Sequence, residues 1–173
     1  MPHALFPTAF GTCGLAWNDA GLTRFSLPEA SAELTARRLG GAGPAVAVGE
    51  APPAVQDVIA RAQRHLGGDL QDFSAVALDI SRVSAFELQV YVRTRAIPAG
   101  QVGTYGRIAA DLGLGPETAR AVGAALGANP WPLVVPCHRV VAASGKMTGF
   151  SAPGGVRTKT RLLALEGAEL LSE

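Results

Sequence analysis

Residues 132–141 read Pro-Leu-Val-Val-Pro-Cys-His-Arg-Val-Val and place a thiol directly before an imidazole. The two prolines enclose a run of apolar residues, which predicts a short buried strand that ends at Pro136. Cys137 would then lie in fixed, non-helical backbone that presents its side chain. The segment therefore predicts a reactive site. The alternative is that Cys137 is a small buried hydrophobic residue, the common state of an intracellular cysteine.

A nucleophilic Cys137 needs a neighbouring base, because a free thiol has a pKa of about 8.5. His138 is the candidate. Adjacent side chains usually point apart, so a bridging water is the expected route for the proton. Glu166 lies in the last turn of a predicted helix over 156–166, where a carboxylate opposes the helix dipole. Spacing alone favours chance exposure for Glu166, and the alternative is a role in holding an imidazole.

The spacing of residues 104–126 predicts a helix-turn-helix. Thr104 can cap a helix over 105–112, a glycine-containing turn follows, and Pro116 sits at the first position of a second helix that reaches Leu126. This second helix has almost no side chain that could read base edges in a major groove.

Small residues on the second helix suit close approach to a minor groove, with Arg120 as the one long cationic probe. The alternative, to which we give equal weight, is that these residues permit close helix packing and that Arg120 is a solvated charge. The candidate DNA-binding residues are Thr118, Ala119, Arg120, Ala121, Gly123 and Ala124.

A domain boundary is predicted near residue 82, which gives an amino-terminal domain over 1–82 and a carboxy-terminal domain over 83–173. Ser84 and Glu87 have capping-box spacing at the start of a helix. The first domain is expected to be a small α+β unit. Its predicted elements are strands over 10–17, 22–27 and 76–80 and helices over 29–39 and 53–66.

The composition excludes several classes of protein. Hydrophobic residues make up 48% of the chain, which is ample for a packed core. Residues up to Ser84 contain 6 Lys or Arg and 8 Asp or Glu, whereas the rest of the chain contains 9 Lys or Arg and 6 Asp or Glu. The carboxy-terminal half is therefore net positive, as expected of a half that approaches phosphates.

The absence of an apolar leader or spanning run predicts a soluble, cytoplasmic protein without a membrane partner. His3 and His65 lack partners at metal-ligand spacing, so no metal is expected.

The signature Pro136-Cys137-His138-Arg139-Val140, with the helix-turn-helix before it, resembles that of the O6-alkylguanine-DNA alkyltransferases, or methylated-DNA–protein-cysteine methyltransferases. The resemblance is strong from Phe86 to Glu169 and weak before it. It implies an α+β fold, in which a small ribonuclease-H-like domain precedes a mostly helical domain with the helix-turn-helix.

The function implied by the resemblance is direct-reversal DNA repair. The partner is double-stranded DNA that contains O6-alkylguanine and is bound through its minor groove. After nucleotide flipping, the alkyl group would pass irreversibly to Cys137 in a single turnover. Neither a cofactor nor an obligate protein partner is implied, and the protein is expected to be a monomer.

The resemblance also implies a role for each candidate residue. Cys137 would be the nucleophile, His138 its base acting through water, and Glu166 the residue that orients His138. The remaining assignments are Asn129 for support of the active-site turn, Tyr105 for guanine N3, Arg120 for intercalation into the base stack, Pro132 for the alkyl pocket, and Val140 and Ser151 for the guanine edge.

Three departures from the family pattern affect the expected rate and alkyl preference. Phe150 replaces a tyrosine in the substrate pocket, Tyr91 replaces a tryptophan, and the loop at 151–155 is longer than usual. A protein that binds alkyl lesions but repairs them slowly or not at all is therefore the runner-up. A Cys-His hydrolase and a transcriptional regulator are weaker alternatives, because no oxyanion hole is indicated and few side chains could read bases.

Overall fold

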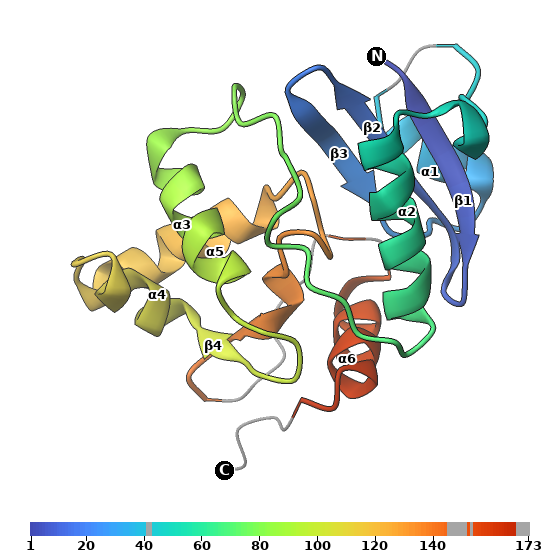
Figure 1. The fold of residues 1–173 in the computed structure, drawn as a ribbon. Helices are drawn as coiled ribbons and strands as arrows, with labels where there is room; N and C mark the ends of the chain where they lie inside the picture. Colours follow the sequence, from blue (N-terminus) through green and yellow to red (C-terminus); the bar gives the residue numbers. More distant parts are fainter. Residues whose placement is uncertain (41–42, 145–151, 153, 169–173) are drawn as a thin grey trace. The chain divides into compact units, whose positions relative to one another are not determined.

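The computed structural model describes residues 1–40, 43–144, 152 and 154–168, and the chain divides into two compact units. The first consists of Met1–Ser81 with Pro130–Val134, and the second of Arg82–Asn129 with Val135–Glu173. The sequence did not predict that residues 130–134 belong with the first unit. Both units combine helices with a small sheet, so the predicted α+β class is correct (Figure 1).

The first unit is built on an antiparallel sheet of order β1-β2-β3. Its strands are β1 (His3–Thr8), β2 (Gly11–Asn18) and β3 (Gly21–Ser26), and its helices are α1 (Ala32–Arg38), the 3-10 helix η1 (Val48–Glu50) and α2 (Pro53–Leu66). The predicted strands over 10–17 and 22–27 correspond to β2 and β3, which pair as an antiparallel hairpin, whereas the sequence did not predict β1. The predicted helix over 53–66 is α2, which buries the apolar side chains Val55, Val58, Ile59, Ala62 and Leu66. The predicted strand over 76–80 is wrong: Leu78 forms one isolated bridge to Leu22, and Ile80 is 46% exposed.

The segment 130–134 is fastened to the hairpin by two hydrogen bonds within the first unit. The backbone N–H of Phe25 donates to the carbonyl of Pro130 over 2.9 Å. The indole Nε1 of Trp131 donates to the carbonyl of Leu22 over 2.8 Å. Because Trp131 is only 1% exposed, its ring is also a buried anchor. Residues 130 and 131 are therefore fixed within the first unit.

The second unit is mostly helical. Its elements are α3 (Ala85–Arg95), β4 (Gly103–Thr104), α4 (Tyr105–Asp111), η2 (Pro116–Thr118), α5 (Ala119–Gly127), η3 (Cys137–Arg139), β5 (Val140–Val141) and α6 (Gly155–Leu165). Helices α3, α4 and α5 pack against one another, and α6 packs against η3. The predicted capping box of Ser84 and Glu87 is present at the start of α3.

The predicted helix-turn-helix is confirmed in its local structure. The Thr104 side chain accepts a hydrogen bond from the backbone N–H of Arg107 and caps α4. Gly113 has a φ of 74°, and the N–H groups of Gly113 and Leu114 return to carbonyls of α4, which ends the helix as in a Schellman motif. Pro116 opens a 3-10 turn, η2, rather than the α-helix itself.

A two-stranded parallel sheet, which the sequence did not predict, joins two distant parts of the second unit. Gly103 pairs with Val140, and Thr104 pairs with Val141. Tyr105 follows β4 directly, and η3 precedes β5 directly. The pairing therefore fixes the start of the helix-turn-helix next to the segment that carries the thiol.

Removal of the Tyr91 hydroxyl is expected to loosen α3 from α5. This hydroxyl donates to the carbonyl of Ala125 over 2.7 Å in a buried position. Tyr91→Phe should lower the free energy of unfolding by about 0.5–1.5 kcal/mol, the usual net value of one such bond. Urea unfolding monitored by circular dichroism measures the change. The control is Val92→Ala at a neighbouring side chain that is 58% exposed and should be near neutral.

Candidate active site

A tight turn, rather than the predicted strand, leads to Cys137. Leu133 is buried and has a φ of 77°, a left-handed conformation that is rare for a residue with a branched side chain. Pro136 has φ −79° and ψ 65°, the angles of an inverse γ-turn. The N–H of Cys137 accordingly donates to the carbonyl of Val135 over 2.7 Å. The predictions of a strand and of non-helical backbone are both wrong, because the chain turns at Leu133 and Cys137 opens the 3-10 helix η3.

Asn129 holds the same turn from the side. Its Nδ2 donates to the carbonyl of Val135 over 2.9 Å, so this carbonyl accepts from both the Asn129 amide and the Cys137 N–H. The Asn129 side chain also makes a hydrogen bond that lowers the pKa of the Cys137 thiol. One amide therefore fixes the backbone before the thiol and stabilises its charged form.

The Cys137 side chain is 7% exposed, and burial is the largest influence on its acidity. Burial raises the pKa of the thiol above its ordinary value. The Asn129 hydrogen bond, the positive charge of Lys159 and two backbone hydrogen bonds oppose this rise. The balance leaves the resting thiol protonated at neutral pH, so its use as a nucleophile needs a group that removes the proton.

His138 and Glu166 meet in the buried part of the site. The imidazole Nε2 lies 3.0 Å from each carboxylate oxygen of Glu166. His138 is 0% exposed and Glu166 is 4% exposed. Because a carboxylate only accepts, Nε2 carries the hydrogen. In the neutral ring Nδ1 is then the unprotonated nitrogen, which suits a base.

Glu166 is the C-cap of α6, next to Gly167 with φ 69°. Spacing alone had favoured chance exposure, and that interpretation is wrong. The carboxylate is buried because Arg139 provides a second partner: its Nε and Nη2 donate to the two oxygens over 2.9 and 2.8 Å. This two-pronged ion pair offsets the unfavourable end of the helix dipole.

Lys159 was not predicted as a site residue. It is 1% exposed, and its Nζ donates to the carbonyl of Val140 over 2.8 Å and lies 5.9 Å from the centre of the Tyr105 ring. Tyr105 begins α4, so Lys159 links β5 to the helix-turn-helix. A signal was present: Lys159 and Glu166 occupy the same buried face of α6 as Leu162 and Leu163.

Helix α5 presents the predicted DNA-binding residues outside this buried cluster. Val122, Ala125 and Leu126 are its buried residues, whereas Arg120, Ala121 and Ala124 are exposed. Thr118, Ala119 and Gly123 are half-buried. The outward position of the small residues favours close approach of an external surface over the alternative of helix packing.

The other predicted pocket residues are only partly described. Val140 is fully buried, and its carbonyl is held by Lys159. Pro132 is buried and belongs to the segment grouped with the first unit. Phe150 and Ser151 lie outside the described residues.

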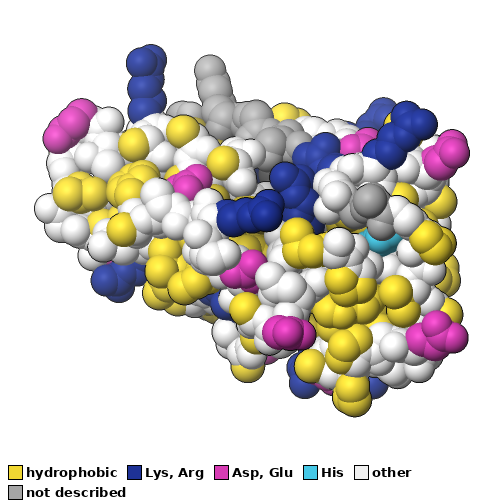
Figure 2. All heavy atoms as spheres, turned by 90° about the horizontal axis from the view of Figure 1, so that it is seen from above, with side chains coloured by type: hydrophobic (Ala, Val, Ile, Leu, Met, Phe, Trp, Pro, Cys, Tyr) yellow, Lys and Arg dark blue, Asp and Glu magenta, His cyan; other side chains and the backbone are white. Residues whose placement is uncertain are grey.

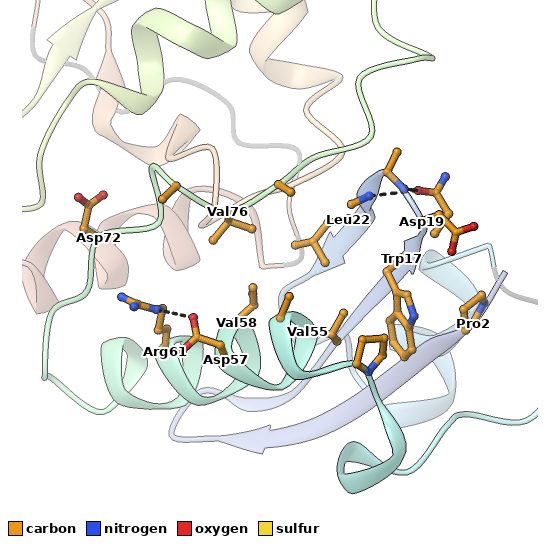
Figure 3. Close-up of a pocket in the computed structure, with 17 residues that line it drawn as sticks. Pro2, Trp17, Asp19, Leu22, Val55, Asp57, Val58, Arg61, Asp72 and Val76 are labelled. Atoms are coloured by element: carbon orange, nitrogen blue, oxygen red, sulfur yellow. Dashed lines mark hydrogen bonds and ion pairs between the residues drawn. The ribbon is translucent and has the colours of Figure 1, made fainter.

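A separate hollow of about 950 Å³ lies within the first unit (Figure 3). Trp17, Leu22, Val55 and Val58 give it apolar walls, and its charged side chains are three aspartates and Arg61, which pairs with Asp57 over 2.8 Å. No cysteine or histidine lines it. The hollow therefore lacks the thiol and imidazole pairing found at Cys137 and His138.

Within the described part of the chain, no three His, Cys, Asp or Glu side chains are placed to hold a metal ion. No helix in the same ranges has both the length and the apolar character needed to cross a membrane. On the face drawn in Figure 2, basic side chains form several groups with acidic ones between them.

Comparison with known proteins gives matches to methylated-DNA–protein-cysteine methyltransferases and to a DNA base-flipping protein of Thermus thermophilus, which is 42% identical over 106 residues, 61% of this chain and 69% of that one. A family described as 6-O-methylguanine DNA methyltransferase, DNA binding domain, matches residues 85–168. A methylated-DNA–protein-cysteine methyltransferase of Mycolicibacterium paratuberculosis is 44% identical over 117 residues, which are 68% of each chain. One of Salmonella typhimurium is 55% identical over 86 residues, which are 50% of this chain and 48% of that one.

The fold also matches over nearly its whole length. The crystal structure of Mycobacterium tuberculosis OGT in complex with DNA superposes with a TM-score of 0.77 and 32% sequence identity, and the match covers 96% of this chain and 93% of that chain. The similarity therefore includes the amino-terminal unit, where sequence resemblance alone was weak.

Loss of the Lys159 charge is expected to make Cys137 less reactive. The charge lowers the pKa of the thiol, so Lys159→Met should raise that pKa further and reduce the thiolate fraction at pH 8. Iodoacetamide labelling of Cys137, followed by mass spectrometry, should slow about tenfold for each unit by which the pKa rises. In both proteins the rate should increase as pH rises, since only the thiolate reacts.

The matched control is Arg157→Met, which removes an exposed cation from the same helix. It should leave labelling unchanged. Equal slowing in the two variants would assign the effect to the overall charge of α6 instead of the contact of Lys159.

Proposed function

Because this chain belongs to the methylated-DNA–protein-cysteine methyltransferase family, we propose that Cys137 is the residue that receives the alkyl group. The protein repairs DNA by direct reversal: it transfers the alkyl group from O6-alkylguanine to its own cysteine. The observation that carries the assignment is the arrangement of Cys137 next to His138, whose Nε2 is held by the buried carboxylate of Glu166. A role limited to lesion binding would not require this route for a proton.

Access to the lesion requires that the nucleotide leave the duplex, because the O6 substituent is hidden inside the base stack. Flipping costs a few kcal/mol, which contacts in the minor groove offset. The exposed small residues of α5 allow its backbone to approach the groove. Arg120 on the same face fills the space that the flipped nucleotide leaves.

The chemistry begins with the thiol proton. This proton passes through a water molecule to Nδ1 of His138, while Glu166 holds the ring in position through its hydrogen bonds with Nε2. The sulfur then forms a bond to the alkyl carbon as the bond from that carbon to O6 breaks. The electron pair stays with the guanine, and Tyr105 supplies a proton at N3 so that a neutral base leaves.

The guanine edge is read by fixed backbone groups. The carbonyl of Val140 is held in place by Lys159, and a carbonyl oxygen has a second lone pair with which to accept from the base. The turn held by Asn129 fixes the Cys137 backbone in the same way. Preorganised groups of this kind avoid reorganisation at the moment of reaction.

The product is a thioether at Cys137. Such a bond has no ready route of hydrolysis or thiol exchange, so the protein reacts once and is consumed. The reaction is therefore stoichiometric in protein, and no cofactor takes part in the steps above.

The mass of the protein should report the transfer directly. After incubation with a duplex that contains one O6-methylguanine, the intact protein should gain the mass of one methylene, located at Cys137 by peptide mapping. Cys137→Ser should show no gain, whereas Cys13→Ser should behave as wild type because Cys13 is a second, buried cysteine. An unchanged wild-type mass with retained binding to the duplex would instead identify a lesion-binding protein.

Replacement of Arg120 should separate flipping from chemistry. Arg120→Ala is expected to slow repair of duplex DNA about tenfold or more, at a cost of 1.4 kcal/mol or above in the flipped state. Reaction with free O6-benzylguanine, which needs no flipping, should stay unchanged. Single-turnover rates on the two substrates provide the comparison.

Arg107→Ala is the control for the loss of a cation, since Arg107 is an exposed arginine of α4 that pairs with Asp111. It should affect duplex repair much less than Arg120→Ala. Equal losses on both substrates in Arg120→Ala would exclude the assigned role.

A further inference from the structure

Arg139 makes three hydrogen bonds in the site, although the mechanism above does not use it. Its Nε and Nη2 bind the two oxygens of Glu166, and its Nη1 donates to the carbonyl of Ile97 over 2.7 Å. The residue is 6% exposed. A buried guanidinium with this many partners is held in one position and faces a single carboxylate.

The charges of the cluster can be counted from these contacts. The Glu166 carboxylate carries one negative charge, and Arg139 carries one positive charge at the same oxygens. With a neutral imidazole the three side chains sum to zero, whereas an imidazolium makes the sum positive. A carboxylate without Arg139 would reverse this preference, because a lone buried negative charge draws a proton onto its neighbour.

We propose that Arg139 is a positioning residue that cancels the Glu166 charge and thereby keeps His138 neutral and able to accept the Cys137 proton. The proposal rests on the function given above, in which His138 is the base. Glu166 alone would orient the ring but would also protonate it in the resting protein. With Arg139 present, the carboxylate still orients the His138 ring, but the other ring nitrogen stays unprotonated and can accept the Cys137 proton.

Other charged or titratable groups around His138 do not replace Arg139 in this role. Helix α6 supplies Lys159, whose Nζ is bonded to the Val140 carbonyl and whose charge acts on Cys137. Helices α3 and α4 supply Tyr91 and Tyr105, and a phenol cannot carry the positive charge needed to offset the Glu166 carboxylate. Burial and the neighbouring Glu87 and Cys137 raise the pKa of Tyr91. Arg139 and His138 both bond to the Glu166 carboxylate.

The test reads the protonation of His138 directly. The chain has 3 histidines, so ring resonances of protein labelled with ¹³C-histidine can be assigned with His3→Gln and His65→Gln. In Arg139→Gln the midpoint for protonation of His138 should rise by about one to three pH units, the usual effect of a nearby uncompensated charge. Arg139→Lys keeps the positive charge but loses the two-point contact with the Glu166 carboxylate. It should therefore raise the His138 midpoint less than Arg139→Gln does.

Alkyl transfer to the full-length protein should follow the same midpoint. Because only neutral His138 accepts the proton, the rate in Arg139→Gln should be low at pH 7 and recover as pH rises through the new midpoint. A purely structural role would lower the rate by one factor at every pH. Arg107→Gln, which breaks an exposed pair, should leave both readouts unchanged.

The double variant Arg139→Gln/Glu166→Gln provides the decisive comparison. It removes both charges, so its His138 midpoint should return to within about one unit of wild type, even if Arg139→Gln alone does not fold. A wild-type midpoint in Arg139→Gln, or a displaced midpoint in the double variant, would overturn the proposal. Failure of the wild-type protein to accept an alkyl group would refute the proposed function, while the resonances would still decide the role of Arg139.

Discussion

The site depends on the buried hydrogen bonds and ion pair that the Glu166 carboxylate makes. Glu166 lies at the end of α6, and its carboxylate accepts hydrogen bonds from His138 and Arg139 of η3. Arg139 also donates to the backbone carbonyl of Ile97. Removal of one partner from such a buried ion pair typically costs about 3–5 kcal/mol, because the other charge is left uncompensated. The position of α6, the orientation of the imidazole and the conformation of η3 are consequently determined together.

The backbone before the thiol is constrained from two directions. Trp131 and Pro130 anchor the incoming chain to the hairpin of the first unit, and Asn129 holds the Val135 carbonyl in the second. Leu133 adopts its left-handed conformation between these anchors, and such strained residues persist only where the surroundings determine them. Within the first unit, the hairpin thus fixes residues 130 and 131.

Local signals in the sequence predicted much of the second unit. The capping box at Ser84, the cap at Thr104 and the proline at residue 116 mark helix starts through contacts within one turn, so they can be read without tertiary structure. Long-range pairings gave no such signal. The β4–β5 ladder joins residues more than thirty positions apart, and the alternation over 76–80 resembled a strand although only Leu78 is paired.

The candidate site shows the same division. Cys137 and His138 were evident because they are adjacent, whereas the place of Glu166 depends on a bond to Arg139 that spacing cannot reveal. Lys159 was overlooked because a lysine on an amphipathic helix is normally solvated, and its burial follows from the acceptor offered by Val140. Buried charges on an apolar helix face are the pattern that would have identified both residues of α6.

Glu166, His138 and Arg139 are buried together, whereas the DNA-binding face is exposed. DNA binding and proton transfer therefore respond differently to ionic strength. Mobile ions screen exposed charges over about 8–10 Å at physiological salt, but they cannot enter between side chains that are packed away from solvent. Salt screens the charge of Arg120, which lies on the exposed face of α5, whereas it does not screen the charge of the buried Arg139. Added salt will therefore weaken the capture of DNA, since bound cations compete with the protein for phosphates, and will leave the movement of the thiol proton untouched.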